Sequence, residues 1–260
     1  MTRLSFEPAS LKGALAAAAL TVFGATNAHA AASSFGEVTA TLTLFGAEAS
    51  DPGTASPFDL DIFSSMDEDS AEFATAGGAT DAVASGETAV LGSFFEPLFT
   101  FTLDAFSESS VGGDAAEAFS DAFASFIIEI SNASLTTSYT VFGDISFDIS
   151  SGSDVDFDGV EEAFAGGEVI LESTSSGDLL GGAGSTAVFT EAGFGGPLSD
   201  SGSISELLEI ELVIGPDSSE IVFFDVYADS LAASVVPVPA ALPLLLSGLA
   251  GFAVINRRRV

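Results

Sequence analysis

Apolar and polar residues alternate along most of the chain between Ala31 and Val236. A period of two is typical of β-strands that turn one face to a core and the other to water. The clearest alternation lies in residues 38–44, 99–103, 126–130, 145–149, 208–214 and 221–228, and weaker runs lie in 58–63, 168–171 and 186–190. The run 221–228 is apolar at both parities, so it predicts a strand that is buried on both faces. In total the pattern predicts about nine strands.

Gly, Ser, Asp and Pro separate these runs at intervals of about ten to twenty residues. Short strands with such regular turn signals indicate an all-β fold, and we expect an antiparallel β-sandwich of the jelly-roll-like kind. Two Ala- and acid-rich segments, 67–84 and 114–124, have weak helical spacing, and we interpret them as loop excursions from the sandwich. The Gly/Ser-rich segments 173–184 and 193–202 predict further loops.

Charge is distributed unevenly along the chain. All five basic residues lie near the two termini, whereas 37 of the 38 acidic residues, all but Glu7, lie between Ala31 and Val236. Because proteins bind nucleic acids through Lys and Arg contacts to phosphate, this acidic region argues against a nucleic-acid partner. Its carboxylates have no Lys or Arg to pair with, so they must be hydrated, hydrogen-bonded or neutralised by dissolved cations.

The same region lacks the side chains of most catalytic centres. The only histidine is His29, and the chain has no cysteine. Serine therefore has no base to activate it, and zinc, copper and haem lack their usual ligands. Carboxylate chemistry remains, so a carbohydrate-active enzyme or lectin is an alternative, although Tyr139 and Tyr227 are the only tyrosines and there is no tryptophan. We expect a protein that is not an enzyme.

One motif between the termini points to a metal ion. Asp154, Asp156 and Asp158 alternate with apolar residues before Gly159, and this spacing gathers oxygen ligands for calcium ahead of a tight turn. The position where an EF-hand has its bidentate glutamate is Ala165, so the motif is not a standard EF-hand loop. The alternative is that the preceding strand continues through the motif, with the aspartates on its wet face. Calcium is the one cofactor that the sequence suggests.

The N-terminus has the three parts of a secretory signal. In order, they are a basic region with Arg3 and Lys12, the apolar run 13–24, and the small-residue cleavage site Ala28-His29-Ala30. We expect residues 1–30 to form a helical signal peptide that directs export through the Sec pathway. Signal peptidase should then cut before Ala31.

The C-terminus also has three parts. In order, they are the motif Val236, Pro237, Val238, Pro239 and Ala240, the apolar run 240–255, and the cluster Arg257, Arg258 and Arg259. The prolines favour a stiff, extended and protease-accessible stretch. As a helix the apolar run is roughly 24 Å long, which is short for a bilayer unless the flanking arginines snorkel. The arginine cluster is expected to stay on the cytoplasmic side.

This tail resembles the PEP-CTERM sorting signal in its VPLPA form, with Val238 in place of the usual leucine. The resemblance covers only residues 236–260. It implies recognition by an exosortase, a membrane-embedded enzyme similar to cysteine transpeptidases, and removal or exchange of the tail near the Pro-Ala step. Proteins of this kind occur in Gram-negative bacteria that make extracellular polysaccharide.

These observations divide the chain into a signal peptide (1–30), an acidic β-sandwich body (31–229), and a linker with the sorting tail (230–260), whose apolar run is expected to be helical. We expect an inner-membrane intermediate that matures to the cell surface or the extracellular matrix. Its role would be structural or binding, with extracellular polysaccharide as a candidate partner. The alternatives are a carbohydrate-active enzyme or lectin and a calcium-dependent adhesin.

Overall fold

The structure is a computed structural model. The residues that it describes are 31–56, 59–75, 78–93, 96–112, 116–156, 161–180, 185–193 and 195–234. The strands all belong to one compact unit, Ala30–Val235, and this described part contains no helix. The predicted signal-peptide helix and tail helix lie outside the described residues.

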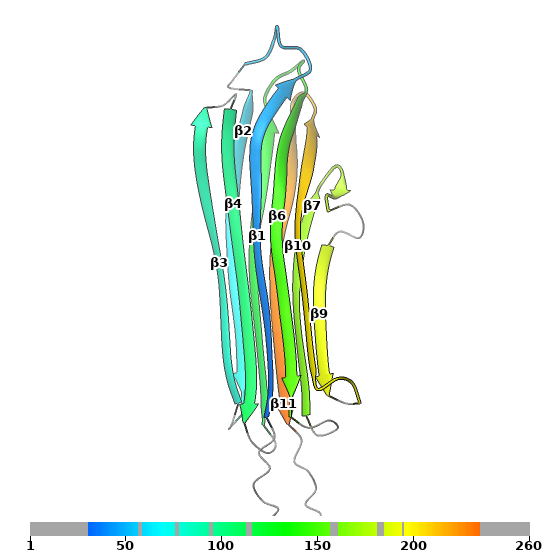
Figure 1. The fold of residues 1–260 in the computed structure, drawn as a ribbon. Helices are drawn as coiled ribbons and strands as arrows, with labels where there is room; N and C mark the ends of the chain where they lie inside the picture. Colours follow the sequence, from blue (N-terminus) through cyan, green and yellow to red (C-terminus); the bar gives the residue numbers. More distant parts are fainter. Residues whose placement is uncertain are drawn as a thin grey trace, which may run out of the picture. The chain divides into compact units, whose positions relative to one another are not determined.

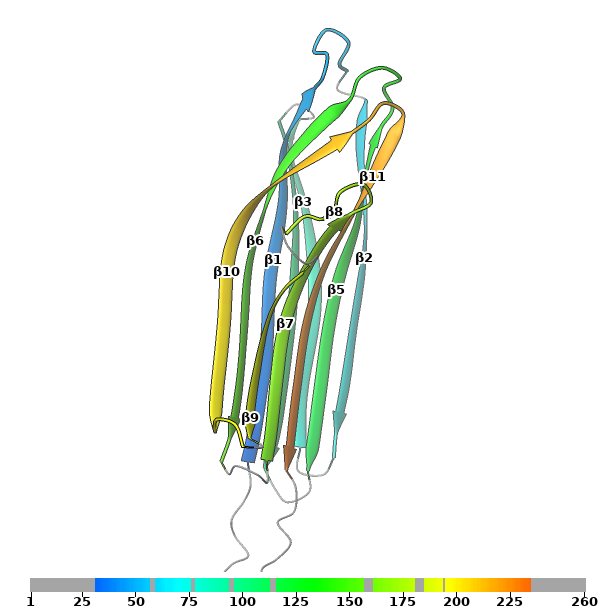
Figure 2. The same ribbon diagram turned by 90° about the vertical axis from the view of Figure 1, so that its right-hand side faces the viewer.

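Two antiparallel sheets form the body and pack face to face (Figures 1 and 2). Sheet A has the strand order β10 (Ser199–Ile214), β6 (Tyr139–Val155), β1 (Ala31–Ala49), β4 (Glu96–Gly112) and β3 (Gly78–Ser93). Sheet B has the order β2 (Leu60–Ala74), β5 (Glu117–Asn132), β11 (Ser218–Ser234) and β7 (Glu161–Ser173), and beside β7 lie β8 (Gly177–Asp178) and β9 (Ser185–Gly193). The prediction of an all-β antiparallel fold is confirmed.

The alternation in the sequence sorts side chains between the core and the surface. On β1, Val38, Ala40 and Leu42 are buried in the core, whereas Thr39 between them is exposed. Successive side chains of a strand point to opposite faces, so one parity of each strand lines the space between the sheets. Each of the six strongest alternating runs lies within a strand, as the pattern predicted.

The core changes character along the strands. One part contains large side chains, where the rings of Phe101 and Phe126 meet edge to face with their centroids 5.4 Å apart. There the hydroxyl of Tyr139 donates a hydrogen bond to Asp59 Oδ2 over 2.8 Å. Towards the end of the body where β1 begins, a second cluster consists mainly of alanines, namely Ala32, Ala116, Ala118, Ala163, Ala192 and Ala232, with Val111 and Val155.

The backbones of the two sheets approach each other closely near this second cluster. A Cβ added at Gly36 on β1 would lie 2.2 Å from the carbonyl oxygen of Gly166 on β7. Buried Ser34 bridges the sheets, because its Oγ donates a hydrogen bond to the carbonyl oxygen of Leu231 over 2.8 Å. Two further bridges join Ser109 to Ser230 and Ser153 to Thr190. Small side chains and hydrogen bonds thus replace apolar volume between the sheets.

Carboxylates protect one open edge of the body. β2 and β3 are edge strands of the two sheets and contact each other across the sandwich. Glu72 Oε1 accepts a hydrogen bond from the backbone N–H of Ala82 over 2.9 Å, and Glu68 Oε1 accepts one from the N–H of Gly86 over 3.0 Å. Unpaired N–H groups on an edge strand can template pairing with another chain, so these contacts disfavour aggregation.

The second half of the body pairs in a nested order. β5 pairs with β11, β6 with β10 and β7 with β9, and the short β8 lies in the connection between β7 and β9. The three pairs belong in turn to sheet B, sheet A and sheet B. This arrangement brings the C-terminal end of β11 back to the end where β1 begins (Figure 1).

Several details of the sequence interpretation were wrong. Segments 67–84 and 114–124 are not loop excursions, because they contribute to β2, β3 and β5. In the first half of β5, Ala118, Ala122 and Ala124 point inward and Phe119 and Phe123 point outward, and an i, i+4 spacing fits a strand as well as a helix. Weak alternation of small residues therefore hid these strands, and the body has eleven described strands rather than about nine.

Two further corrections concern the last strand and the predicted loops. β11 is not buried on both faces, since Phe223 on its outer side is 37% exposed. The strand also continues past residue 229, where we expected the body to end, because Ala232 and Ser234 are buried and paired within sheet B. The predicted loop regions 173–184 and 193–202 contain β8 and the beginning of β10.

The close approach of the sheets predicts a strong effect of one methyl group. Replacing Gly36 with alanine should lower the free energy of unfolding by about 1–3 kcal/mol, because backbone atoms cannot move aside as a flexible side chain can. Urea denaturation would measure the loss. Gly46→Ala is the matched control on the same strand, because a Cβ there has nothing within 4 Å. Equal stability of the two variants would contradict the close approach.

Candidate functional site

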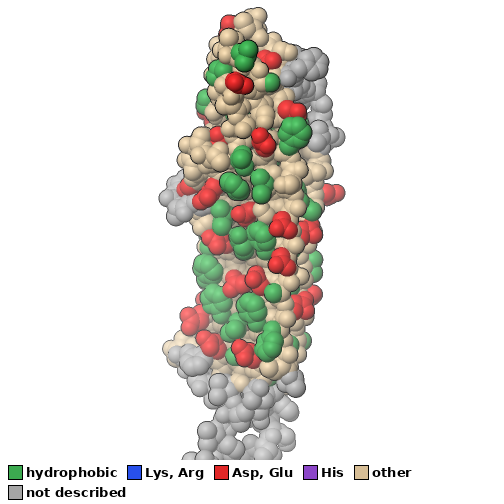
Figure 3. All heavy atoms as spheres, turned by 180° about the vertical axis from the view of Figure 1, so that it is seen from behind, with side chains coloured by type: hydrophobic (Ala, Val, Ile, Leu, Met, Phe, Trp, Pro, Cys, Tyr) green, Lys and Arg blue, Asp and Glu red, His purple; other side chains and the backbone are tan. Residues whose placement is uncertain are grey.

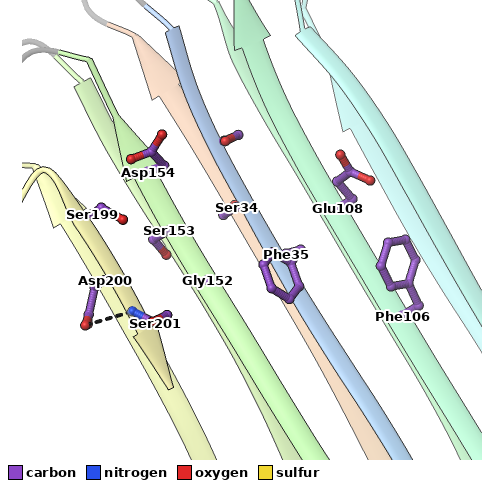
Figure 4. A pocket seen from close by; sticks show the side chains of 11 residues that line it. Ser34, Phe35, Phe106, Glu108, Gly152, Ser153, Asp154, Ser199, Asp200 and Ser201 are labelled. Atoms are coloured by element: carbon purple, nitrogen blue, oxygen red, sulfur yellow. Dashed lines mark hydrogen bonds between the residues drawn. The ribbon is translucent and has the colours of Figure 1, made fainter. Parts of the chain in front are cut away.

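A shallow pocket of about 340 Å³ lies on the outer face of sheet A near the start of β1 (Figure 4). Its lining comes from four neighbouring strands, β1, β4, β6 and β10. The residues are Ser33, Ser34, Phe35, Phe106, Glu108, Gly152, Ser153, Asp154, Ser199, Asp200 and Ser201. We call this the pole pocket.

A glycine opposite an aromatic ring shapes the pole pocket. Phe35 and Gly152 are cross-strand partners on β1 and β6, and a Cβ added at Gly152 would lie 2.5 Å from the ring of Phe35. The missing side chain leaves room for the ring next to β6, and Figure 4 shows Phe35 on β1 beside Gly152 on β6. Phe35 stays 40% exposed, so its ring offers a flat apolar surface to a ligand.

Carboxylates surround this ring. Asp154 and Glu108 line the pocket beside Phe35, whereas Asp200 at the β10 side is paired with buried Ser153, and its Oδ2 accepts a hydrogen bond from the N–H of Glu191 over 3.4 Å. Asp200 is held by the backbone, since its Oδ1 accepts a hydrogen bond from the N–H of Ser201 over 2.9 Å. With hydroxyls, carboxylates and an aromatic ring, the pocket can accept hydrogen bonds from a polyhydroxyl or cationic ligand.

The predicted calcium ligands lie next to this pocket. Asp154 is exposed on its wall, and Asp156 is exposed just after β6 ends at Val155. Asp158 and Gly159 lie outside the described residues. Up to Val155 the chain follows the alternative interpretation, with Val155 buried in the core and Asp154 on the wet face.

A buried carboxylate near the motif was not singled out as a ligand from the sequence. Glu161 opens β7 and is fully buried, and its Oε2 accepts a hydrogen bond from the backbone N–H of Asp156 over 2.6 Å. Its place two residues after Gly159 was visible in the sequence, but its burial was not. Within the part of the chain that the structure describes, no group of three or more His, Cys, Asp or Glu is arranged to hold a metal ion. Calcium binding stays a prediction.

The residues predicted for processing lie mostly outside the described chain. The residues outside the description are Ala28, Ala30, the motif 236–240 and the cluster 257–259. Ala31 is described as the first residue of β1, and its carbonyl oxygen accepts a hydrogen bond from the N–H of Asp156 over 3.1 Å. In the described segments we find no helix with the length and apolar character needed to cross a membrane.

A second surface, on the outer face of sheet B, was not foreseen from the sequence. Asp121 on β5 and Asp229 on β11 are direct cross-strand partners, so two like charges lie side by side. Burial raises the pKa of Asp229 above its ordinary value of 3.8, and the Asp121 carboxylate raises that pKa further. Burial and the nearby Asp69 raise the pKa of Asp121 in the same way. This crowding is a destabilising feature of the fold.

Comparisons with known proteins do not assign a family. No family model matches the chain, and no curated protein matches it. Among solved structures, the alignment with the lysenin pore has 9% sequence identity and a TM-score of 0.08. It covers 65% of this chain and 49% of that chain, so the chain spans about half the length of that structure.

Removing one charge of the crowded pair should stabilise the protein. Because the pKa of Asp229 is raised in the folded state, its ionisation weakens folding as the pH rises through that value. Asp229→Asn should therefore raise the free energy of unfolding at pH 7 by roughly 0.2–1 kcal/mol. The gain should disappear near pH 3, where most carboxyl groups of the wild type and of the variant are protonated.

Thermal denaturation at the two pH values measures this effect. Glu129→Gln is the matched control, because Glu129 is exposed on β5 and faces Ile221 and Phe63 rather than another acid. A stabilisation by Asp229→Asn that is equal at both pH values would contradict the electrostatic origin.

Calcium should raise the melting temperature through Asp154 and Asp156. An ion that binds only the folded state adds about 2.7 kcal/mol at a hundredfold excess over its Kd. The measurement compares millimolar calcium chloride with sodium chloride of equal ionic strength, for wild type and for Asp154→Asn with Asp156→Asn. Asp144→Asn with Asp148→Asn is the matched control, because it removes the same amount of charge from the outward face of β6. An equal rise in both salts would show screening instead of a site.

Proposed function

We propose that the chain is an exported protein of the cell surface or extracellular matrix. It would be held first in the inner membrane by its tail and processed there by an exosortase. The observation that carries this proposal is the extent of the folded body. The compact unit is Ala30–Val235, and its described strands begin with Ala31, at the expected signal-peptidase cut, and end with Ser234, before the motif that begins at Val236. Both cuts would leave every described strand intact.

The position of the two ends supports attachment by the tail. β1 begins and β11 ends at the same end of the body, where Ser34 on β1 is hydrogen-bonded to Leu231 on β11 (Figures 1 and 2). β6 and β11 have 17 residues each. A strand of this length extends roughly 55 Å at about 3.3 Å per residue. A body tethered by its C-terminus would therefore carry its far end well away from the point of attachment.

A non-catalytic role agrees with the chemistry of the body. Between Ala31 and Val236 the sequence has no His, Cys, Lys or Arg, so no serine can be paired with a basic side chain. We also propose that the sandwich is jelly-roll-like. The nested pairs β5 with β11, β6 with β10 and β7 with β9 support this. The signal peptide and the tail would each be helical. The acidic body would have no nucleic-acid partner.

The pole pocket favours carbohydrate binding as a second function. The exposed ring of Phe35 lies among hydroxyls and the carboxylates of Asp154 and Glu108. A ring of this kind can stack against the apolar face of a sugar while the oxygens accept hydrogen bonds from its hydroxyls. Extracellular polysaccharide is therefore the partner that we propose for the pocket. A calcium ion at Asp154, Asp156 and Asp158, the ligands predicted from the sequence, would make the binding calcium-dependent, as in an adhesin.

Processing of the tail gives the experiment that tests the main proposal. Replacing Pro237, Val238 and Pro239 with alanine should remove the extended recognition stretch, so that the protein is exported but stays in the membrane fraction. Mass spectrometry of both chain ends in each cell fraction would measure this. Wild type should begin at Ala31 and lack the arginine cluster.

Pro216→Ala is the control, because it removes a proline from the turn between β10 and β11 and leaves the tail unchanged. That variant should be processed as wild type is. Normal release of the triple variant would show that the motif is not a sorting signal. A wild-type chain that begins at Met1 outside the cell would contradict the signal peptide.

A further inference from the structure

The outer face of sheet B carries apolar rungs on its two central strands, β5 and β11. Strand pairing sets these side chains opposite each other, and each is outward because the alternate residues are buried in the core. The three apolar rungs are Phe119 with Leu231, Phe123 with Tyr227, and Ile127 with Phe223. Figure 3 shows hydrophobic side chains interspersed with carboxylates along this face.

Polar rungs alternate with the apolar ones. Asp121 lies opposite Asp229 between the first and second apolar rungs, and Ser125 lies opposite Asp225 between the second and third. The Ser125 hydroxyl donates a hydrogen bond to Asp225. Burial raises the pKa of Asp225, and the nearby Glu172 raises it further. We call these five rungs the banded face.

The banded face has the properties of a docking surface. The rings of Phe123 and Tyr227 stack with centroids 4.6 Å apart, and Ile127 and Phe223 are 45% and 37% exposed. Burying these partly exposed apolar side chains against a partner would remove them from water, which is favourable. The carboxylates between them are already partly desolvated, which strengthens their attraction to an incoming cation.

Charge decides which kind of partner fits. The body has no Lys or Arg, so a second copy of the chain would bring aspartates against aspartates. The partner must therefore supply cations together with apolar groups. Electrostatic complementarity of this sort speeds encounter and selects against acidic partners.

The spacing of the rungs decides the partner's form. Successive rungs are two residues apart along a strand, which is about 6.6–6.8 Å. An extended polypeptide has the same distance between side chains i and i+2, because it has the same rise per residue. A segment lying along β5 and β11 can therefore place every second side chain over successive rungs.

We propose that the banded face binds an extended segment of a basic polypeptide in which Lys or Arg alternates with apolar residues at every second position. Each ammonium or guanidinium group enters a polar rung and donates to Asp121 and Asp229, or to Asp225. Each apolar side chain packs on the rings of the adjacent rungs. The role of the face is independent of the tail and of the pole pocket.

A spacing-matched peptide tests this inference. The probe is a labelled nonapeptide with leucine at its first, fifth and ninth positions, lysine at its third and seventh, and threonine elsewhere. The comparison peptide has the same composition, with one lysine moved to an even position so that it points away from the face. Fluorescence anisotropy with the purified full-length protein should give about tenfold tighter binding of the matched peptide, or about 1.4 kcal/mol.

Variants of the face provide the second part of the test. Asp121→Asn with Asp229→Asn should weaken binding of the matched peptide about tenfold, or about 1.4 kcal/mol, without loss of folding. Asp104→Asn with Asp148→Asn removes equal charge from exposed positions on the outer face of sheet A and should leave binding unchanged.

Three results would overturn the inference. The first is equal affinity for the matched and rearranged peptides, which would indicate attraction to any polycation. The second is an equal loss of binding in the two double variants. The third is equally tight binding of a glucosamine oligomer of the same charge, which would indicate a cationic carbohydrate rather than a polypeptide. None of these results bears on export or tail processing, so the two proposals fail separately.

Discussion

The packing of the two sheets against each other is the interaction on which the rest of the structure depends. The region between Ala31 and Val236 carries 37 acidic residues with no Lys, Arg or Cys. Ion pairs with basic side chains and disulfides therefore contribute nothing to this region, and its negative charges repel one another. Apolar burial between the sheets and the hydrogen bonds of the strand ladders must offset this repulsion.

The two sheets approach each other most closely at small residues near the start of β1. Alanine, glycine and serine fill this end of the core, and Gly36 lies against the backbone at Gly166. The buried side chains here are smaller than those in the part around Phe101 and Phe126. Hydrogen bonds such as the one from Ser34 to Leu231 join the sheets instead, and they tie the first and last strands together where the chain enters and leaves the body.

Carboxylates are placed where the fold can use them or water can reach them. Glu68 and Glu72 cover N–H groups of the edge strand β3, and Glu161 holds the backbone just after β6. Asp121 and Asp229 are the costly exception, because they lie opposite each other on the banded face. A feature that weakens folding without an evident structural gain is consistent with selection for binding.

By itself the sequence determined the all-β antiparallel class and the strongest strands, because alternation is a local property of the chain. It also led to the processing predictions, which concern residues outside the described body. Alternation was too weak to identify β3, the part of β2 after residue 63 and the first half of β5. β2 is exposed along most of its length, and small residues fill the inward positions in the first half of β5.

Only the tertiary structure decided which outward residues become neighbours. Strand pairing joins residues far apart in the chain, such as Phe35 to Gly152 and Asp121 to Asp229. Register is a property of two strands and the core they share, so a single strand's pattern cannot specify it. The pole pocket and the banded face therefore appear only when the sheets are assembled.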